Sequence, residues 1–266
     1  MRIIDIILNF LEIMRDRVPK SIKFPFLSRL ELWFYQRFRQ STFLFNGRQY
    51  YYFYHLYNQT WRNERAVEIP IIWHAVREHL KSYPNAKILE VGNVMSHYFS
   101  HYVLEYQKTS SWDIVDKYER PHEYSIKIIN EDIVQFNPNK KYSLIISIST
   151  LEHIGFQEHL YGGEPIFEPG KILKAFENMV NLLDENGTMI VTIPIGENPY
   201  LDKMLAIGCL KFSEIYAMIK IGRNWWQVSF EGAIKYKGKN MKIVIIGILR
   251  KKDYKDKGTH TCNKLF

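Results

Sequence analysis

The sequence has little cysteine: Cys209 and Cys262 are the two in 266 residues, and no Cys-x-x-Cys pair occurs. A zinc site built on thiolates is therefore not expected. Two cysteines also do not make the disulfide framework of a small secreted protein, so we expect both thiols to be reduced and the protein to be cytoplasmic. The chain contains no internal repeat and no low-complexity tract.

Long apolar runs are also missing. Residues 3–14 come closest, but polar residues recur there at spacings of three and four, which places them on one face of a helix. The run is too short to span a bilayer and lacks the small-residue cleavage site of a signal peptide. Such an amphipathic helix packs on its own domain or a partner subunit, or it makes a peripheral contact at a membrane face. Basic residues directly after it would support the membrane contact: Arg15, Arg17, Lys20 and Lys23.

What the chain does have is an apolar fraction of 46% and a net charge of +8. The first supports a sizeable core and the second a partner such as nucleic acid, an anionic membrane or a phosphorylated substrate. Part of the charge lies in the basic tail, which we interpret as solvated. We predict an N-terminal helical and aromatic-rich extension (1–63), a main domain (64–250) and a flexible tail (251–266). The tyrosines of residues 50–57 form a packed cap or stack on a sugar or base.

Apolar strands and helical segments alternate through the main domain. This order predicts an α/β fold with a doubly wound, mostly parallel sheet. The expected strands are 87–92, 112–116, one ending near 131–132, 142–149, 188–194 and 241–249. The expected helices are 71–83, with Pro70 in the first turn, then 169–183 and 203–221.

The first expected strand ends in a glycine turn at Gly92, and Asp116 follows 24 residues later, at the end of the second strand. That spacing suits an acid that accepts hydrogen bonds from a ribose. The further glycines of a three-glycine dinucleotide fingerprint do not follow Gly92. Their absence counts against an NAD enzyme.

The ordered landmarks resemble the class I S-adenosylmethionine-dependent methyltransferases over residues 64–250, most clearly 87–194. A narrower likeness, to small methyltransferases of glycan and surface-polysaccharide modification, rests on Glu90–Tyr98 and Ser149–His153. The resemblance implies a seven-stranded Rossmann-like sheet whose last strand is antiparallel, and S-adenosylmethionine as cofactor.

The resemblance also implies which residues hold the cofactor. Glu90 would orient the turn and the methionine moiety, Asp132 or its neighbour Glu131 would contact the adenine amino group, and Asp116 the ribose. The complete expected set is Glu90, Gly92, Asn93, Asp116, Glu131, Asp132, Ser149 and Leu151. Because the family usually has glycine where this chain has Val94 and Ser96, the turn must differ locally or bind more loosely.

Methyl transfer to an alcohol is an in-line displacement that benefits from a base. His153 is the first candidate and Glu152 the second, since both follow the fourth strand; His153 could instead be a structural residue. An acid-histidine pair recurs at Glu158-His159, but we interpret the segment as a polar loop with no metal. Asn198-Pro199-Tyr200 follows the fifth strand and is interpreted as a turn, which could also line the acceptor pocket.

The sequence thus predicts a methyltransferase that acts on a small or glycan-type acceptor, at oxygen. Two alternatives stay open. An RNA methyltransferase would fit the positive charge, although no RNA-binding module is recognisable and nucleic acid is not the expected partner. A non-catalytic scaffold on the same fold would fit the loss of the two glycines.

Overall fold

The computed structural model describes residues 7, 10–11, 25–38, 41–109, 111–119, 126–156, 162, 167–236, 241–254 and 262. By contacts, the chain divides into two compact units. The first comprises residues 1–71 and 220–226, and the second 72–219 and 227–266. The first unit therefore extends past the expected boundary at residue 63. Most of the predicted helix over 3–14 lies outside the described residues.

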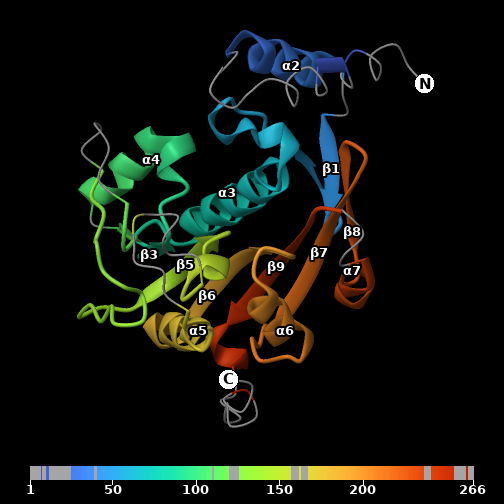
Figure 1. Cartoon of the computed structure of the whole chain (residues 1–266). Coiled ribbons are helices and arrows are strands. Elements are labelled where there is room, and N and C mark those ends of the chain that lie inside the picture. Colours follow the sequence, from blue (N-terminus) through green and yellow to red (C-terminus); the bar gives the residue numbers. More distant parts are fainter. Residues whose placement is uncertain are drawn as a thin grey trace. The chain divides into compact units, whose positions relative to one another are not determined.

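A seven-stranded sheet has the order β4-β3-β5-β6-β9-β7-β8 (Figure 1). Its strands are β3 (Ile88–Val91), β4 (Trp112–Val115), β5 (Tyr142–Ile148), β6 (Leu183–Pro194), β7 (Glu214–Ile221), β8 (Asn224–Val228) and β9 (Ile243–Arg250). β3 runs parallel to β4 and β5, and β5 runs parallel to β6. β9 is antiparallel to β6 and β7. This arrangement confirms the predicted mostly parallel α/β fold, with its antiparallel strand near the end of the chain.

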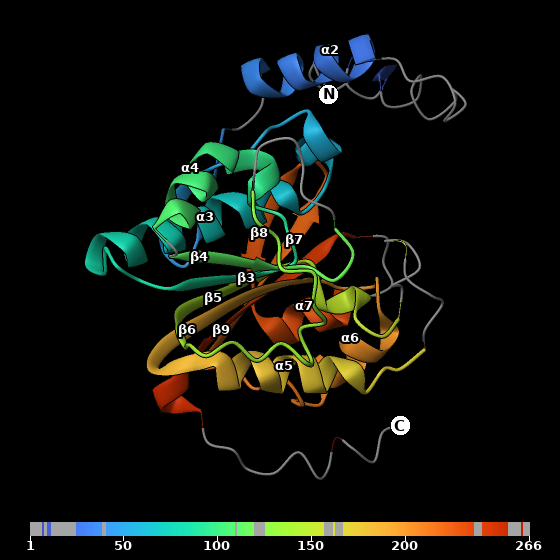
Figure 2. The same ribbon diagram turned by 90° about the vertical axis from the view of Figure 1, so that its left-hand side faces the viewer.

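Helices cover both faces of this sheet. The described helices that lie wholly within the second unit are α4 (Ser96–Lys108), α5 (Lys171–Leu182), α6 (Pro199–Ala206) and α7 (Phe230–Tyr236). Figure 2 shows α4 over one face and α5 and α6 over the other. On α5 the buried side chains of Ile172, Phe176 and Met179 recur at helical spacing and pack into the main core. Because helices occupy both faces, the central strands are apolar on both sides, as β5 and β9 show.

Two expected elements are wrong. The third strand is reduced to one parallel bridge between Val115 and Ile129. Next to it the Asp116 carbonyl accepts a hydrogen bond from Asn130 Nδ2 at 2.9 Å, so a side chain does what a strand partner would do. The helix expected over 203–221 is instead the end of α6 followed by β7. Pairing with β9 prevails over the local helical pattern there.

Helix α3 (Arg65–Ser82) begins six residues before the predicted start, with Pro70 inside it. Proline has no amide hydrogen, so the carbonyl four residues earlier loses its helical partner. That carbonyl belongs to Ala66, and it accepts a hydrogen bond from Phe53 N at 3.0 Å. A contact distant in the sequence therefore makes the internal proline tolerable, which the local pattern could not show.

The first unit contains α2 (Pro25–Phe38), the hairpin β1 (Thr42–Phe45) and β2 (Arg48–Tyr51), and the short 3-10 segment η1 (Tyr57–Arg62). Its aromatic side chains pack on one another: Phe43 stacks on Tyr50, and Tyr52 on Tyr54 at 5.7 Å between ring centroids. The described helices include none that is long and apolar enough to cross a membrane.

The expectation of two reduced cysteines is wrong in the structure. Cys209, just after α6, forms a disulfide with Cys262, and the two Cα atoms are 5.9 Å apart. Because 53 residues separate them in the sequence, no local spacing pattern announces this pair. The described residues of the second unit also form two 3-10 segments, η2 (Leu151–His153) and η4 (Lys251–Asp253).

Candidate functional site

The carboxyl ends of β3, β4 and β5 meet at one edge of the sheet, where α/β folds bind ligands. The turn after β3 touches the segment after β5 at Gly92. Its φ is +84°, and a Cβ placed there would lie 2.2 Å from Thr150 Oγ1. Both the left-handed backbone and the close approach require glycine at this position.

Glu90 holds this turn from inside the sheet. Its Oε1 accepts hydrogen bonds from Val94 N (2.8 Å) and Met95 N (2.7 Å), and Oε2 accepts one from Trp112 Nε1 (3.2 Å). Complete burial raises the pKa of Glu90 to about 7, although these donors act in the opposite direction. The carboxylate thus fixes the backbone of a turn that lacks two of the expected glycines. Contact between Glu90 and a methionine moiety stays a prediction.

Asn93 provides an unused donor in the turn. The side chain is buried, and its Oδ1 accepts a hydrogen bond from the Ser96 hydroxyl. Its Nδ2 is buried without a hydrogen-bond partner among the described residues. A buried donor without an acceptor lowers the stability of the fold unless a bound molecule supplies the acceptor. A polar ligand atom at this edge of the sheet would do so.

Asp116 lies where the sequence predicts it, directly after β4. Its Oδ2 accepts a hydrogen bond from Asn93 N at 3.0 Å, which ties the two loops together. Its Oδ1 accepts from Tyr118 N (3.1 Å) and Glu119 N (2.9 Å). An ionised carboxylate has about four acceptor positions, so Oδ2 retains capacity for a hydroxyl.

Asp132 and Glu131 differ in their surroundings. The Asp132 carboxylate lies 2.7 Å from Lys171 Nζ and 3.1 Å from Lys117 Nζ. Burial raises the pKa of Asp132, but the hydrogen bonds and charges, chiefly from Lys171, outweigh burial and hold that pKa below its ordinary value. Glu131 is exposed. Contact of either acid with adenine stays a prediction.

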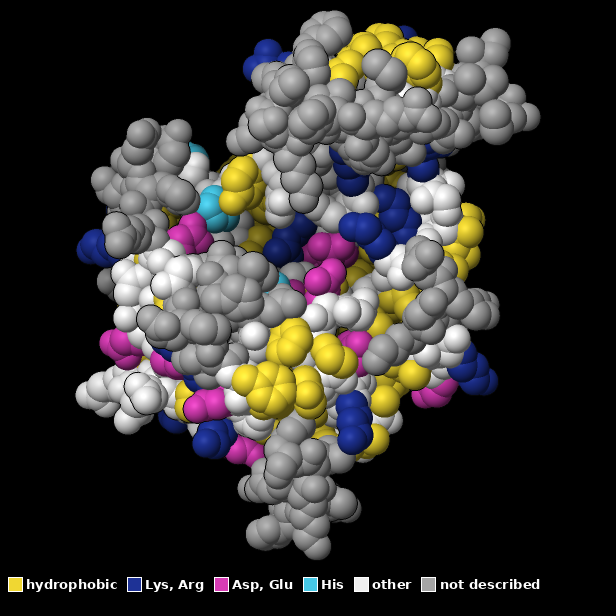
Figure 3. Space-filling model, viewed as in Figure 1, with side chains coloured by type: hydrophobic (Ala, Val, Ile, Leu, Met, Phe, Trp, Pro, Cys, Tyr) yellow, Lys and Arg dark blue, Asp and Glu magenta, His cyan; other side chains and the backbone are white. Residues whose placement is uncertain are grey.

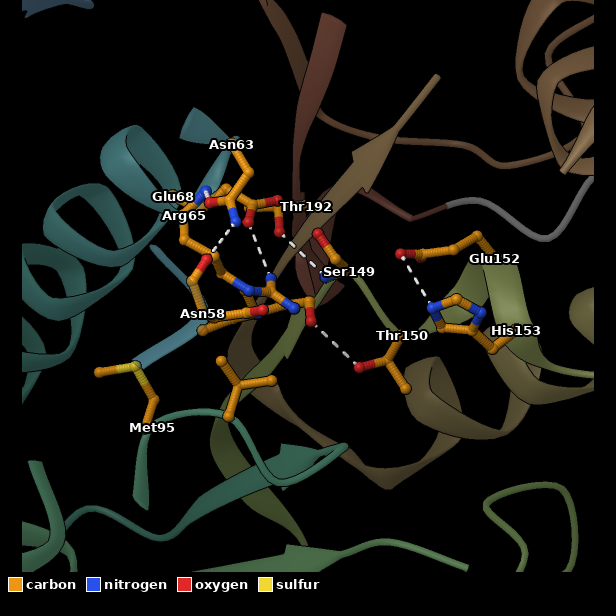
Figure 4. A network of polar contacts seen from close by, with 12 residues as sticks. Asn58, Asn63, Arg65, Glu68, Met95, Ser149, Thr150, Glu152, His153 and Thr192 are labelled. Carbon is orange, nitrogen blue, oxygen red and sulfur yellow. Dashed lines mark hydrogen bonds and ion pairs between the residues drawn. The ribbon is translucent and has the colours of Figure 1, made fainter. Parts of the chain in front are cut away.

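The backbone is strained at the end of β5. Ser149 has a φ of +43°, in the left-handed region that a residue with a side chain seldom adopts. Its amide donates to the carbonyl of Thr192 at 3.0 Å, and Figure 4 shows the two residues side by side. Strain of this kind concentrates at functional sites. Leu151, in contrast, has its side chain in the hydrophobic core, so only its backbone could contact a ligand.

Glu152 and His153 face each other on η2 (Figure 4). Glu152 Oε1 lies 3.7 Å from His153 Nε2; the acid is buried, whereas 22% of the histidine side chain is exposed. Nε2 of the imidazole faces the acid, and Nδ1 is buried. An acid beside an imidazole is the pairing that a general base uses.

Asn198 fastens this pair, and sequence reasoning missed its role. Its Nδ2 donates to the Glu152 carbonyl at 2.8 Å, while its Oδ1 accepts from the amides of Tyr200 and Leu201. The expected turn is thus the N-cap of α6, followed by Pro199 in the first helical position. An asparagine before a proline is a helix-start signal that could have revealed the cap.

The acid-histidine repeat is only partly described, because Glu158 and His159 lie outside the described residues. Among the residues that the structure does describe, no group of three or more His, Cys, Asp or Glu could hold a metal ion.

Comparison with known proteins gives similarity to solved structures alone. No family model and no curated protein matches the chain. The N-methyltransferase NodS from Bradyrhizobium japonicum, in complex with S-adenosylhomocysteine, is similar with 14% identity and a TM-score of 0.40, over 74% of this chain and 97% of that chain.

Two other similar structures are methyltransferases. Magnesium protoporphyrin IX methyltransferase from Synechocystis PCC 6803, with bound S-adenosylmethionine, has 11% identity and a TM-score of 0.35, over 66% of this chain and 78% of that one. The sugar N-methyltransferase KedS8 from Streptoalloteichus has 12% identity and a TM-score of 0.33, over 69% and 66%.

Proposed function

We propose that the protein transfers a methyl group from S-adenosylmethionine to a small or glycan-type acceptor, at oxygen. The observation that carries this proposal is that Asn93 and Asp116 meet at the edge of the sheet where β3 and β4 end. One supplies a buried donor without a partner, and the other a carboxylate with remaining capacity.

The residues at this edge fit an adenosyl cofactor. Asp116 would accept hydrogen bonds from the ribose hydroxyls, and Asn93 Nδ2 would donate to a cofactor oxygen or ring nitrogen. Ser149 would line the path to the methyl group, and Asp132 or Glu131 would contact the adenine. When bound, the cofactor supplies an electrophilic methyl group on a sulfonium. The chain's own contribution is to hold donor and acceptor in line.

His153 is the base in this proposal. An acceptor hydroxyl would pass its proton to the imidazole as the methyl group arrives. Glu152, 3.7 Å away, would stabilise the resulting imidazolium. Asn198 keeps Glu152 in place through the hydrogen bond to its carbonyl. The role of Asn198 is therefore positioning.

The test replaces His153 by alanine and measures transfer of labelled methyl from S-adenosylmethionine to a panel of saccharides. We expect transfer to fall at least ~100-fold while S-adenosylhomocysteine binds unchanged. The matched control is His79→Ala, since His79 contacts Ser143 Oγ at 2.9 Å, at the start of β5, and should not affect transfer. Equal turnover in His153→Ala would exclude His153 as the base.

The same assay separates the alternatives. Label that appears in RNA and not in saccharides would favour the RNA methyltransferase. A folded protein that binds no S-adenosylhomocysteine and transfers no label would favour the scaffold.

A further inference from the structure

Three aromatic side chains gather on segments that are hydrogen-bonded to η2 or adjoin it: Phe156, Phe167 and Tyr200. The ring centroids of Phe167 and Tyr200 are 5.3 Å apart, and Phe156 lies 6.1 Å from Tyr200 and 6.4 Å from Phe167. Although these rings pack edge-on or tilted, Phe167 is 62% exposed. Figure 3 shows hydrophobic side chains gathered between α5 and α6 on the surface of the molecule.

Backbone hydrogen bonds connect the segments that carry Phe156 and Phe167. Phe156 N donates to the His153 carbonyl at 3.2 Å, and Glu168 N donates to the Gly155 carbonyl at 2.7 Å. Gly155 has a φ of +69°, and a Cβ there would lie 2.3 Å from the Glu168 carbonyl oxygen, so the two segments cross in close contact. Phe156 and Phe167 are therefore held at fixed positions relative to His153.

The third ring is tied to the same place from another element. Tyr200 is the second residue of α6, and the Asn198 cap of that helix is hydrogen-bonded to the Glu152 carbonyl. The aromatic trio is thus built by two hydrogen-bonded connections to η2, the segment that carries the proposed base. Removing apolar surface from water is favourable, so a phenylalanine that is held in an exposed position indicates a surface that a ligand covers.

We propose that Phe156, Phe167 and Tyr200 form the acceptor-binding surface, and that the acceptor is a pyranose sugar; this inference rests on the proposed function. A pyranose presents an apolar C–H face that aromatic rings can cover, together with hydroxyl groups at its rim. One of the three rings, Tyr200, carries a hydroxyl, and His153 lies on the adjoining segment η2, so these two groups would meet the hydroxyl groups of the sugar. A purely aliphatic acceptor would use the rings but not these groups, so the mixed surface favours the sugar.

The test measures sugar binding directly, without turnover. Methyl β-D-glucopyranoside and methyl β-D-galactopyranoside are the probes, in saturation-transfer difference NMR with saturating S-adenosylhomocysteine. The variants are Phe167→Ala, at an exposed site that folding should tolerate, and Tyr200→Phe, which removes only the hydroxyl. The matched control is Tyr83→Ala, because Tyr83 is also 62% exposed but belongs to a groove before the start of β3.

We expect the affinity of Phe167→Ala for a probe to fall roughly fivefold, and that of Tyr83→Ala to stay unchanged. Absence of a signal in the wild-type protein, or equal affinity in wild type and Phe167→Ala, would overturn the inference. Binding of 1-octanol with no sugar signal would overturn the sugar class as well. Calorimetric titration of S-adenosylhomocysteine reports separately on the proposed function, so either can fail without the other.

Discussion

Replacing Gly92 by alanine tests how the turn after β3 is built. The φ of +84° costs a residue with a side chain about 1–2 kcal/mol. The new methyl group would also lie 2.2 Å from Thr150 Oγ1 and 2.8 Å from Thr150 Cγ2. Overpacking of this kind costs about 1–3 kcal/mol. We therefore expect Gly92→Ala to lower the free energy of unfolding by roughly 2–5 kcal/mol.

A second variant, Thr150→Ala, separates the cost of the left-handed backbone from the cost of overpacking. In Thr150→Ala the two closest atoms are gone and only Cβ, at 3.0 Å, remains, so the cost of Gly92→Ala should fall toward the backbone part of about 1–2 kcal/mol. The control is Gly196→Ala: Gly196 has a φ of +102° with no atom within 4 Å of an added Cβ. Its cost should be the same in both backgrounds.

The assay is urea unfolding followed by tryptophan fluorescence, for the four members of the cycle and the control. An equal cost of Gly92→Ala with and without Thr150 would refute the reasoning, because the clash would then contribute nothing.

Three further predictions concern stability. Because the folded-state pKa of Glu90 is about 7 and its ordinary value is 4.5, the unfolded chain loses this proton first. The free energy of unfolding should thus fall by roughly 3 kcal/mol as the pH rises from 4.5 to about 7. Glu90→Gln should remove this fall when urea unfolding is measured across the pH range. Reduction of the Cys209–Cys262 disulfide, which closes a loop of 53 residues, should lower the free energy of unfolding by about 4 kcal/mol, whereas two titratable thiols in the unreduced native protein would contradict the pairing. Ser149→Gly should relieve its left-handed backbone and raise the melting temperature, while Ser147→Gly, within β5, should lower it; the opposite order would show that Ser149 is not strained.

The parts of the fold that the sequence predicts are those with a strong local signal. β5 and β9 are apolar runs that only a sheet covered on both faces can bury, so their assignment needed no tertiary information. The position of Asp116 follows from its spacing after Gly92. The hydrogen bond from Asn93 N to Asp116 Oδ2 shows that the turn after β3 and the segment after β4 meet.

The features that the sequence does not reveal depend on partners distant along the chain. Pro70 fits inside α3 because Phe53 satisfies the Ala66 carbonyl. The segment 214–221 becomes a strand because β9 pairs with it. No spacing rule relates two such partners, so a pattern of propensities assigns each segment by itself and misses the pairing.

The candidate site shows the same division. The resemblance predicts that Glu90 orients the turn, whereas the three donors that its carboxylate binds are visible only in the structure. The aromatic trio was missed because Phe156 and Tyr200 are 44 positions apart in the sequence and only the folded chain brings their rings to 6.1 Å.

The central claim is that Asp116 binds the ribose of an adenosyl cofactor, and calorimetric titration of S-adenosylhomocysteine tests it most directly. The variant is Asp116→Asn, and the matched control is Asp113→Asn, at a position within β4 that bonds Tyr142 Oη at 2.6 Å. We predict micromolar binding to the wild type and to the control, weakened tenfold or more in Asp116→Asn. No binding to the folded wild type, or equal affinity in all three proteins, would contradict the account.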